Sequence, residues 1–188
     1  MTSWTWLGDH LAVDFANTVR EVGGAMVDLI PTVDDFTGWL GEEAQRLPQL
    51  EELSEDGLRD LRQLRDSILS LLHAATAGGE LPAPAVTLVN DAVFKAATTR
   101  TLIGVGQTQA VPACSDPVMA LRGMLAAAAI DLLAREDLAN LALCRAPGCG
   151  QFFHRARPNQ RWCSPGCGNR ARVDRHRHRQ ARPAGQEP

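Results

Sequence analysis

Four cysteines near the C-terminus constrain the possible folds of this chain more than any other feature. Cys144, Cys149, Cys163 and Cys167 follow the pattern C-x4-C-x13-C-x3-C. Two close pairs separated by a loop supply the four soft ligands that zinc takes in a tetrahedral site. Because four thiolates leave no position open for water, the spacing predicts one structural Zn²⁺ and no catalytic metal.

The sequence around these cysteines predicts a small fold of its own. The knuckle "RAPGCG" lies between "LALC" and "QFFH", which favours two short strands. Ser164 is a good N-cap and Pro165 suits a first helical position, so Cys167 should begin a helix that runs to about Arg182. Together these features predict a treble-clef-like zinc finger over residues 144–182, with Trp162 packed beside the metal and a disordered tail at 183–188.

Other interpretations of the cysteines are less favoured. His154 lies five residues after Cys149 and could replace one thiolate, but four cysteines already fill the coordination shell. Disulfides are rare in the reducing cytoplasm, where we expect this chain to reside. Cys114 has no partner nearby in the sequence and is expected to be a core or hairpin thiol.

Charge is divided unevenly along the chain, although the net charge is only −3. Residues 1–143 carry 20 acidic and 9 basic side chains, whereas residues 144–182 carry ten arginines and the single acid Asp174. Such asymmetry indicates that the basic part contacts nucleic acid or a membrane surface. No apolar run is long enough to span a bilayer, and the N-terminus has no basic, signal-like start, so we expect a cytoplasmic protein that contacts no membrane.

The predicted C-terminal helix concentrates this positive charge. Arginines three and four residues apart share a helix face, where like charges repel and weaken an isolated helix. A polyanion such as DNA would relieve that repulsion, and Asn169 could read adenine in the major groove. The rival interpretation is a solvated basic tail, with Arg145 and Arg161 offsetting the charge of the zinc centre. The predicted nucleic-acid-binding residues are Asn169, Arg170, Arg172, Arg175, Arg177, Arg179 and Arg182.

Residues 1–143 predict a mainly α-helical domain that carries one small β-hairpin. Apolar periodicity, N-caps and glycine or proline breaks predict its helices. A β-branched run around a Gly-x-Gly turn predicts the hairpin at 99–114, and "WTWLG" predicts a short strand. The expected helices cover 9–20, 32–44, 54–79, 81–98 and 115–137.

Two motifs resemble known families. "WCSPGCGNRAR" contains Cys-Gly-Asn-Arg at 167–170 and resembles the CGNR zinc finger, while "LAVDFANTV" and "DLIPTVDDFTGWL" resemble the ABATE domain. The resemblance implies a bacterial stress-related transcription regulator that binds DNA through the finger. It departs from the family at "FFHRARPN", where relatives commonly have an Asp-x-Ser stretch.

Asp14 and Asn17 belong to the N-terminal motif and have two interpretations. They could line a ligand pocket, or they could cap a helix and tie loops to the backbone, which is the commoner role of such residues. Trp4, Trp6 and Trp39 are likewise expected in the core before they are expected at a ligand.

The sequence therefore predicts a DNA-binding transcription regulator whose helical domain senses an unknown small-molecule or protein signal, or forms a homodimer. Because "NLALCRAP" contains no flexible linker, the two parts are expected to pack together. One rival is a zinc-stabilised interaction module that binds an acidic partner. Another is a nuclease that uses His154, but too few further histidines and acids accompany it, so we expect no enzyme.

Overall fold

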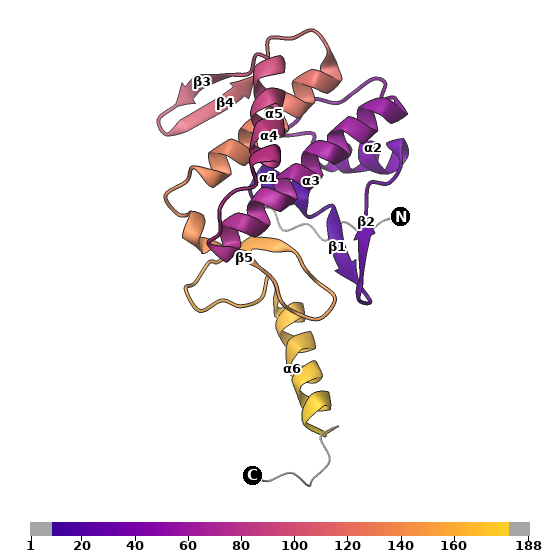
Figure 1. Cartoon of the computed structure of the whole chain (residues 1–188), viewed down its shortest axis with the longest axis vertical. Coiled ribbons are helices and arrows are strands. Elements are labelled where there is room, and N and C mark those ends of the chain that lie inside the picture. The colour runs from indigo at the N-terminus through magenta and orange to yellow at the C-terminus, as the bar shows by residue number, and fades with distance from the viewer. Residues whose placement is uncertain (1–8, 181–188) are drawn as a thin grey trace.

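The computed structural model describes residues 9–180 and contains six α-helices and three two-stranded antiparallel sheets within that range (Figure 1). The elements in order are α1 (Leu11–Ala16), β1 (Val19–Val22), β2 (Ala25–Asp28), α2 (Val33–Glu42), α3 (Glu55–Ala77), α4 (Ala83–Lys95), β3 (Thr99–Gly104), β4 (Gln107–Val111), α5 (Pro117–Leu133), the 3₁₀ turn η1 (Leu138–Asn140), β5 (Leu141–Leu143), β6 (Phe152–His154) and α6 (Pro165–Gln180). The mainly helical fold class is confirmed.

The core forms where α1, α2, α4 and α5 pack around the long helix α3 (Figure 1). Ser54 caps α3 by accepting a hydrogen bond from the Gly57 N–H, and Gly78 ends the helix in the left-handed conformation. Leu58, Leu61, Leu64, Ile68 and Leu72 recur at helical spacing along α3, and all are buried. Trp39 is fully buried on α2 and stacks obliquely on Phe15, so its predicted place in the core is confirmed.

Helices α4 and α5 pack closely because small residues line their contact. A Cβ placed on Gly123 would lie 2.3 Å from the Ala96 Cβ, so only glycine allows this approach. Asp116 caps α5 by accepting hydrogen bonds from the backbone N–H groups of Val118 and Met119.

The predicted helix at 9–20 is wrong beyond Ala16, since β1 and β2 form a second hairpin that the sequence analysis missed. Its turn is Gly23-Gly24, and both glycines have positive φ, at 61° and 87°. The pair therefore closes a tight hairpin turn, where the sequence analysis treats it as a break after a helix. The β-branched residues Thr18, Val19 and Val22 favour extended backbone over a last helical turn.

The hairpin predicted at 99–114 is confirmed as β3–β4. It stands away from the core, and Leu102 and Ile103 are exposed on it. Cys114 follows this hairpin, half-buried, and is remote from the other four cysteines.

The C-terminal part begins at β5, and α6 extends from it away from the helical body (Figure 1). Only Cys167 and Ala171 of α6 are buried. Arg182, the tail at 183–188, and Trp4 and Trp6 lie outside the described residues. Within 9–180, none of the helices is long and apolar enough to cross a bilayer.

Candidate metal centre and basic helix

The four predicted zinc ligands converge. The sulfurs of Cys144, Cys149, Cys163 and Cys167 all lie within 4.8 Å of one another. The Sγ–Sγ distance is 3.7 Å from Cys149 to Cys163 and 3.4 Å from Cys163 to Cys167. A tetrahedral ion with Zn–S bonds of about 2.3 Å separates its sulfurs by about 3.8 Å, so the cluster has the size that zinc needs.

The thiols are also chemically suited to a cation. Hydrogen bonds from Cys149 and Cys163 lower the pKa of Cys144 to about 2, whereas the hydrogen bond to Cys144 raises the pKa of Cys149 to about 12. Four adjacent thiolates would repel each other, so the cluster favours a bound cation. A divalent ion would replace the thiol protons and stabilise all four sulfurs as thiolates. The donor set thus fits a zinc site.

Local structure positions each pair of cysteines. Strands β5 and β6 pair antiparallel from Leu141–His154 to Leu143–Phe152, and the knuckle between them carries the first two cysteines. Gly148 and Gly150 flank Cys149 with φ of 66° and 64°, a conformation that disfavours other residues. On the other side, Ser164 accepts a hydrogen bond from the Cys167 N–H at 3.2 Å, which confirms its predicted capping role.

Arg170 contacts the cysteine cluster directly. Its Nη2 donates to the Cys167 Sγ at 3.0 Å, so this guanidinium offsets negative charge on the sulfurs. Arg145 and Arg161, which the sequence analysis considers for that role, make no hydrogen bond to a cysteine sulfur within the described residues. Trp162 packs against the first turn of α6, where a Cβ on Gly168 would lie 3.1 Å from the indole. The expected apolar wall beside the cluster is present.

The other predicted DNA-contacting residues lie exposed along α6. Arg172 donates to the Asn169 side chain at 3.3 Å, and Arg175 donates to the Ala171 carbonyl at 3.2 Å. Arg177 and Arg179 follow on the last turns of the helix. Beyond Ala171 the helix has no buried residue, so its arginine side chains face solvent.

Arginines in the two parts of the chain have different partners. In the helical domain, these arginines pair with carboxylates: Arg46, Arg59, Arg62, Arg65, Arg100, Arg122 and Arg135. None of the nine arginines from Arg145 to Arg179 pairs with a carboxylate of the described residues. Within residues 9–180, the arginines of the C-terminal part therefore have no carboxylate counter-ion.

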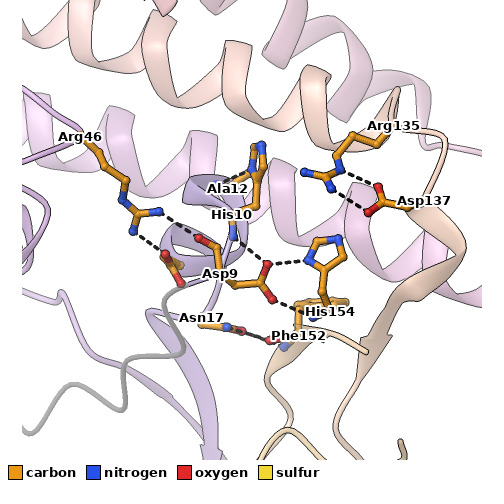
Figure 2. A network of polar contacts seen from close by, with 10 residues as sticks. Asp9, His10, Ala12, Asn17, Arg46, Arg135, Asp137, Phe152 and His154 are labelled. Atoms are coloured by element: carbon orange, nitrogen blue, oxygen red, sulfur yellow. Dashed lines mark hydrogen bonds and ion pairs between the residues drawn. The ribbon is translucent and has the colours of Figure 1, made fainter. Parts of the chain in front are cut away.

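Asn17 joins the helical domain to the C-terminal part (Figure 2). Its side-chain amide donates to the Phe152 carbonyl at 3.0 Å and its carbonyl accepts from the Phe152 N–H at 2.8 Å. Phe152 and Leu141 belong to the same core as α1 and α3. These contacts confirm the expected packing of the two parts and favour the structural interpretation of Asn17.

Asp9 and His154 form a second connection that the sequence analysis missed (Figure 2). Asp9 accepts from the His154 backbone N–H at 2.7 Å, and its other oxygen contacts the His154 Nδ1 at 2.5 Å. His154 therefore binds Asp9 and lies outside the cysteine cluster.

A third connection joins the Glu21 N–H to the Cys149 carbonyl at 3.2 Å, which brings the knuckle against β1. No local sequence pattern identifies such contacts, because they join residues more than 120 positions apart.

Asp14 also has a structural partner. Its carboxylate is almost fully buried and pairs with Arg46 at 2.5 Å, and Arg46 also binds Glu43. Burial raises the pKa of Asp14 and of Glu43, although the hydrogen bonds from Arg46 act in the opposite direction. The two carboxylates and Arg46 thus fix the loop after α2 to α1.

Comparison with known families agrees with both resemblances. The family model described as "Putative stress-induced transcription regulator" (ABATE) matches residues 9–136, and the CGNR zinc finger model matches residues 140–180. The search of curated proteins found no match. Because the first model covers more than half of the chain and the second covers the four cysteines, the chain belongs to the ABATE family and carries a CGNR zinc finger.

Proposed function

We propose that this protein is a transcription regulator that binds duplex DNA through α6, and that one structural Zn²⁺ on the four cysteines holds that helix in place. The observation that supports the proposal most strongly is the set of exposed arginines on α6 that have no carboxylate partner within 9–180. DNA phosphates provide the missing negative charge, and an α-helix fits the major groove.

The zinc has an architectural role in this proposal. Cys144 and Cys149 would supply two ligands from the knuckle, and Cys163, just before α6, and Cys167, in its first turn, would supply the other two. We propose that this arrangement is a treble clef. Four thiolates fill the coordination shell, so the ion would activate no water, and we propose no catalytic activity.

A salt-dependent binding assay tests the proposal. Zinc-loaded full-length protein is titrated with a random 20-bp duplex between about 50 and 300 mM salt. About five phosphate contacts should give a log–log slope near −4.5. Absence of binding at the lowest salt would overturn the proposal, and it would favour an acidic protein partner, the alternative that the same exposed arginines allow.

A variant pair assigns the binding to α6. Replacing Arg175 and Arg179 by alanine should weaken binding to all sequences alike and lower the slope by about two. The matched control replaces Arg59 and Arg122, which bind Asp56 and Asp60 in the helical domain, and should leave DNA binding unchanged. An equal loss in both double variants would show that net charge, and not α6, determines binding.

A further inference from the structure

A groove of about 740 Å³ lies where the last turns of α3 meet the finger. His73, Thr76 and Ala77 of α3 form one wall, and β5 and the segment 155–162 form the other. We call this space the seam groove. It is separate from the exposed face of α6, because no residue of α6 lines it.

Three arginines give the seam groove its charge. Arg145, Arg155 and Arg161 line it, and none of them pairs with a carboxylate of the described residues. Among the described residues that line the groove, none is an aspartate or glutamate. A comparable groove beside α3 and α4 also contains arginines, but there Arg59 and Arg62 bind Asp56 and Asp28, and Asp66 is part of the lining. The seam groove is therefore a cationic site without a counter-ion from residues 9–180.

The segment that carries these arginines is held in place by its own hydrogen bonds. The Gln160 side chain accepts from the Ala156 N–H at 2.8 Å and donates to the Trp162 carbonyl at 3.0 Å. The Arg155 N–H donates to the Asn140 carbonyl at 2.9 Å. Because these bonds fix the backbone, the guanidinium groups of Arg155 and Arg161 start from defined positions on one wall.

An aromatic surface accompanies the charge. Trp162 lines the groove and is half-buried, with one edge of its indole against Gly168. His73 lines the opposite wall, and its ring is held edge-on by Phe152 at 4.9 Å between ring centres. Arginines bind phosphate through forked hydrogen bonds, and an indole can stack on a planar base.

We propose that the seam groove binds a small phosphorylated ligand of the nucleotide class, with phosphates on Arg155 and Arg161 and the base on Trp162. Because His73 and Thr76 of α3 line the opposite wall, a ligand that fills the groove also contacts α3 and bridges the two parts of the molecule. The proposal does not depend on DNA binding by α6, because the groove uses other residues.

Calorimetric titration of the zinc-loaded full chain with ATP tests the proposal. Saturable one-to-one binding is expected, with adenosine and pyrophosphate each at least about tenfold weaker, because each lacks half of the recognised chemistry. Equal affinity for pyrophosphate and ATP would overturn the nucleotide assignment. Binding of ATP that does not saturate would overturn the site itself.

Matched double variants localise the binding. Arg155→Ala with Arg161→Ala should weaken ATP binding about tenfold or more, whereas Arg177→Ala with Arg179→Ala removes the same charge from α6 and should change it less than about twofold. Equal losses in both would show diffuse attraction and overturn the proposal. Because the four arginines are exposed, unchanged melting curves are expected for both variants. If ATP does not bind, and the groove variant weakens duplex DNA binding as much as the α6 variant does, the groove belongs to the DNA surface instead.

Discussion

The helical domain and the finger use the same residue in opposite ways. In the domain, Arg65 is 3% exposed and binds Asp28 and Asp66, so its charge contributes to folding. In the finger, Arg177 and Arg179 lie in solvent with no such partner within 9–180. A guanidinium that already has a carboxylate gains little from a phosphate. The pairing of arginines, more than their number, therefore distinguishes the helical domain from the finger.

The largest effect on zinc binding and folding is expected when one of the four cysteines is replaced. Cys163→Ser should lose zinc and unfold the finger, because the three remaining ligands would hold the ion weakly and their side chains are buried around it. Since Leu141 and Phe152 share the main core, the melting temperature of the whole chain should fall as well. Zinc stoichiometry and a thermal melt measure both effects. Cys114→Ser, outside the cluster, is the control. Retained stoichiometric zinc in Cys163→Ser would contradict the assignment of this ligand.

The next largest effect on stability is expected when a buried arginine loses its carboxylate partner. Asp28→Asn leaves Arg65 buried with only Asp66 as its carboxylate partner and should cost about 3–5 kcal/mol of unfolding free energy. Asp56→Asn breaks the pair with the exposed Arg59 and should cost no more than about 1 kcal/mol. Urea denaturation of the two variants compares them. Equal costs would remove the distinction between buried and exposed arginine pairs within the domain.

The Asp28–Arg65 pair should make the stability of the protein fall in acid. Burial alone would raise the pKa of Asp28, but hydrogen bonds from Arg65 and Ile30 lower it below its usual 3.8. An acid with a lowered folded-state pKa stabilises the protein above its unfolded pKa, and this stability is lost as the pH falls through the folded value. The stability difference between wild type and Asp28→Asn should therefore shrink below about pH 4. A constant difference down to pH 2 would contradict the pair's ionic character.

A further pH effect should arise at the junction of the two parts. Burial, followed by the charges of Arg135 and His154, lowers the pKa of His10 to about 4. A histidine with a lowered folded-state pKa resists protonation, so it destabilises the fold as the pH falls from about 6.5 to about 4. His10→Asn keeps an acceptor for the Ala12 N–H and should flatten the pH dependence in that window. An unchanged profile in urea melts from pH 7 to 4 would show that other groups cause it.

The smallest effect on stability is expected from the exposed arginines of α6, which are proposed to bind DNA. Arg177→Ala with Arg179→Ala removes two exposed like charges and should change the unfolding free energy by less than about 0.5 kcal/mol. The same variant should lower the salt dependence of DNA binding. A destabilisation above about 1 kcal/mol would mean that these arginines support the fold, as Arg65 does in the helical domain.

Features set by nearby residues could be predicted from the sequence. The four cysteines, the Ser54 and Ser164 caps, and the β3–β4 hairpin all depend on local spacing and capping chemistry. The β1–β2 hairpin was missed because the short apolar period before it also fits a helix, and the turn glycines were interpreted as a helix break.

Contacts between distant residues could not be predicted. The pairing of Asp9 with His154 and of Glu21 with Cys149 exists only after the chain folds back on itself. Asp14 and Asn17 were identified as notable residues, but their partners Arg46 and Phe152 have no sequence signature. The seam groove has the same origin, because its two walls come from α3 and from the finger.

The placement of Phe152 in the core beneath α1 and α3 makes the finger a poor candidate for transplantation. A fragment cut at the finger's N-terminal side would carry its cysteines and basic helix but would leave Phe152 and Leu141 facing water. Fusion proteins that borrow this finger for targeting would have to include the helical domain, or replace both side chains with polar ones. The finger and the helical domain would therefore have to be transferred together.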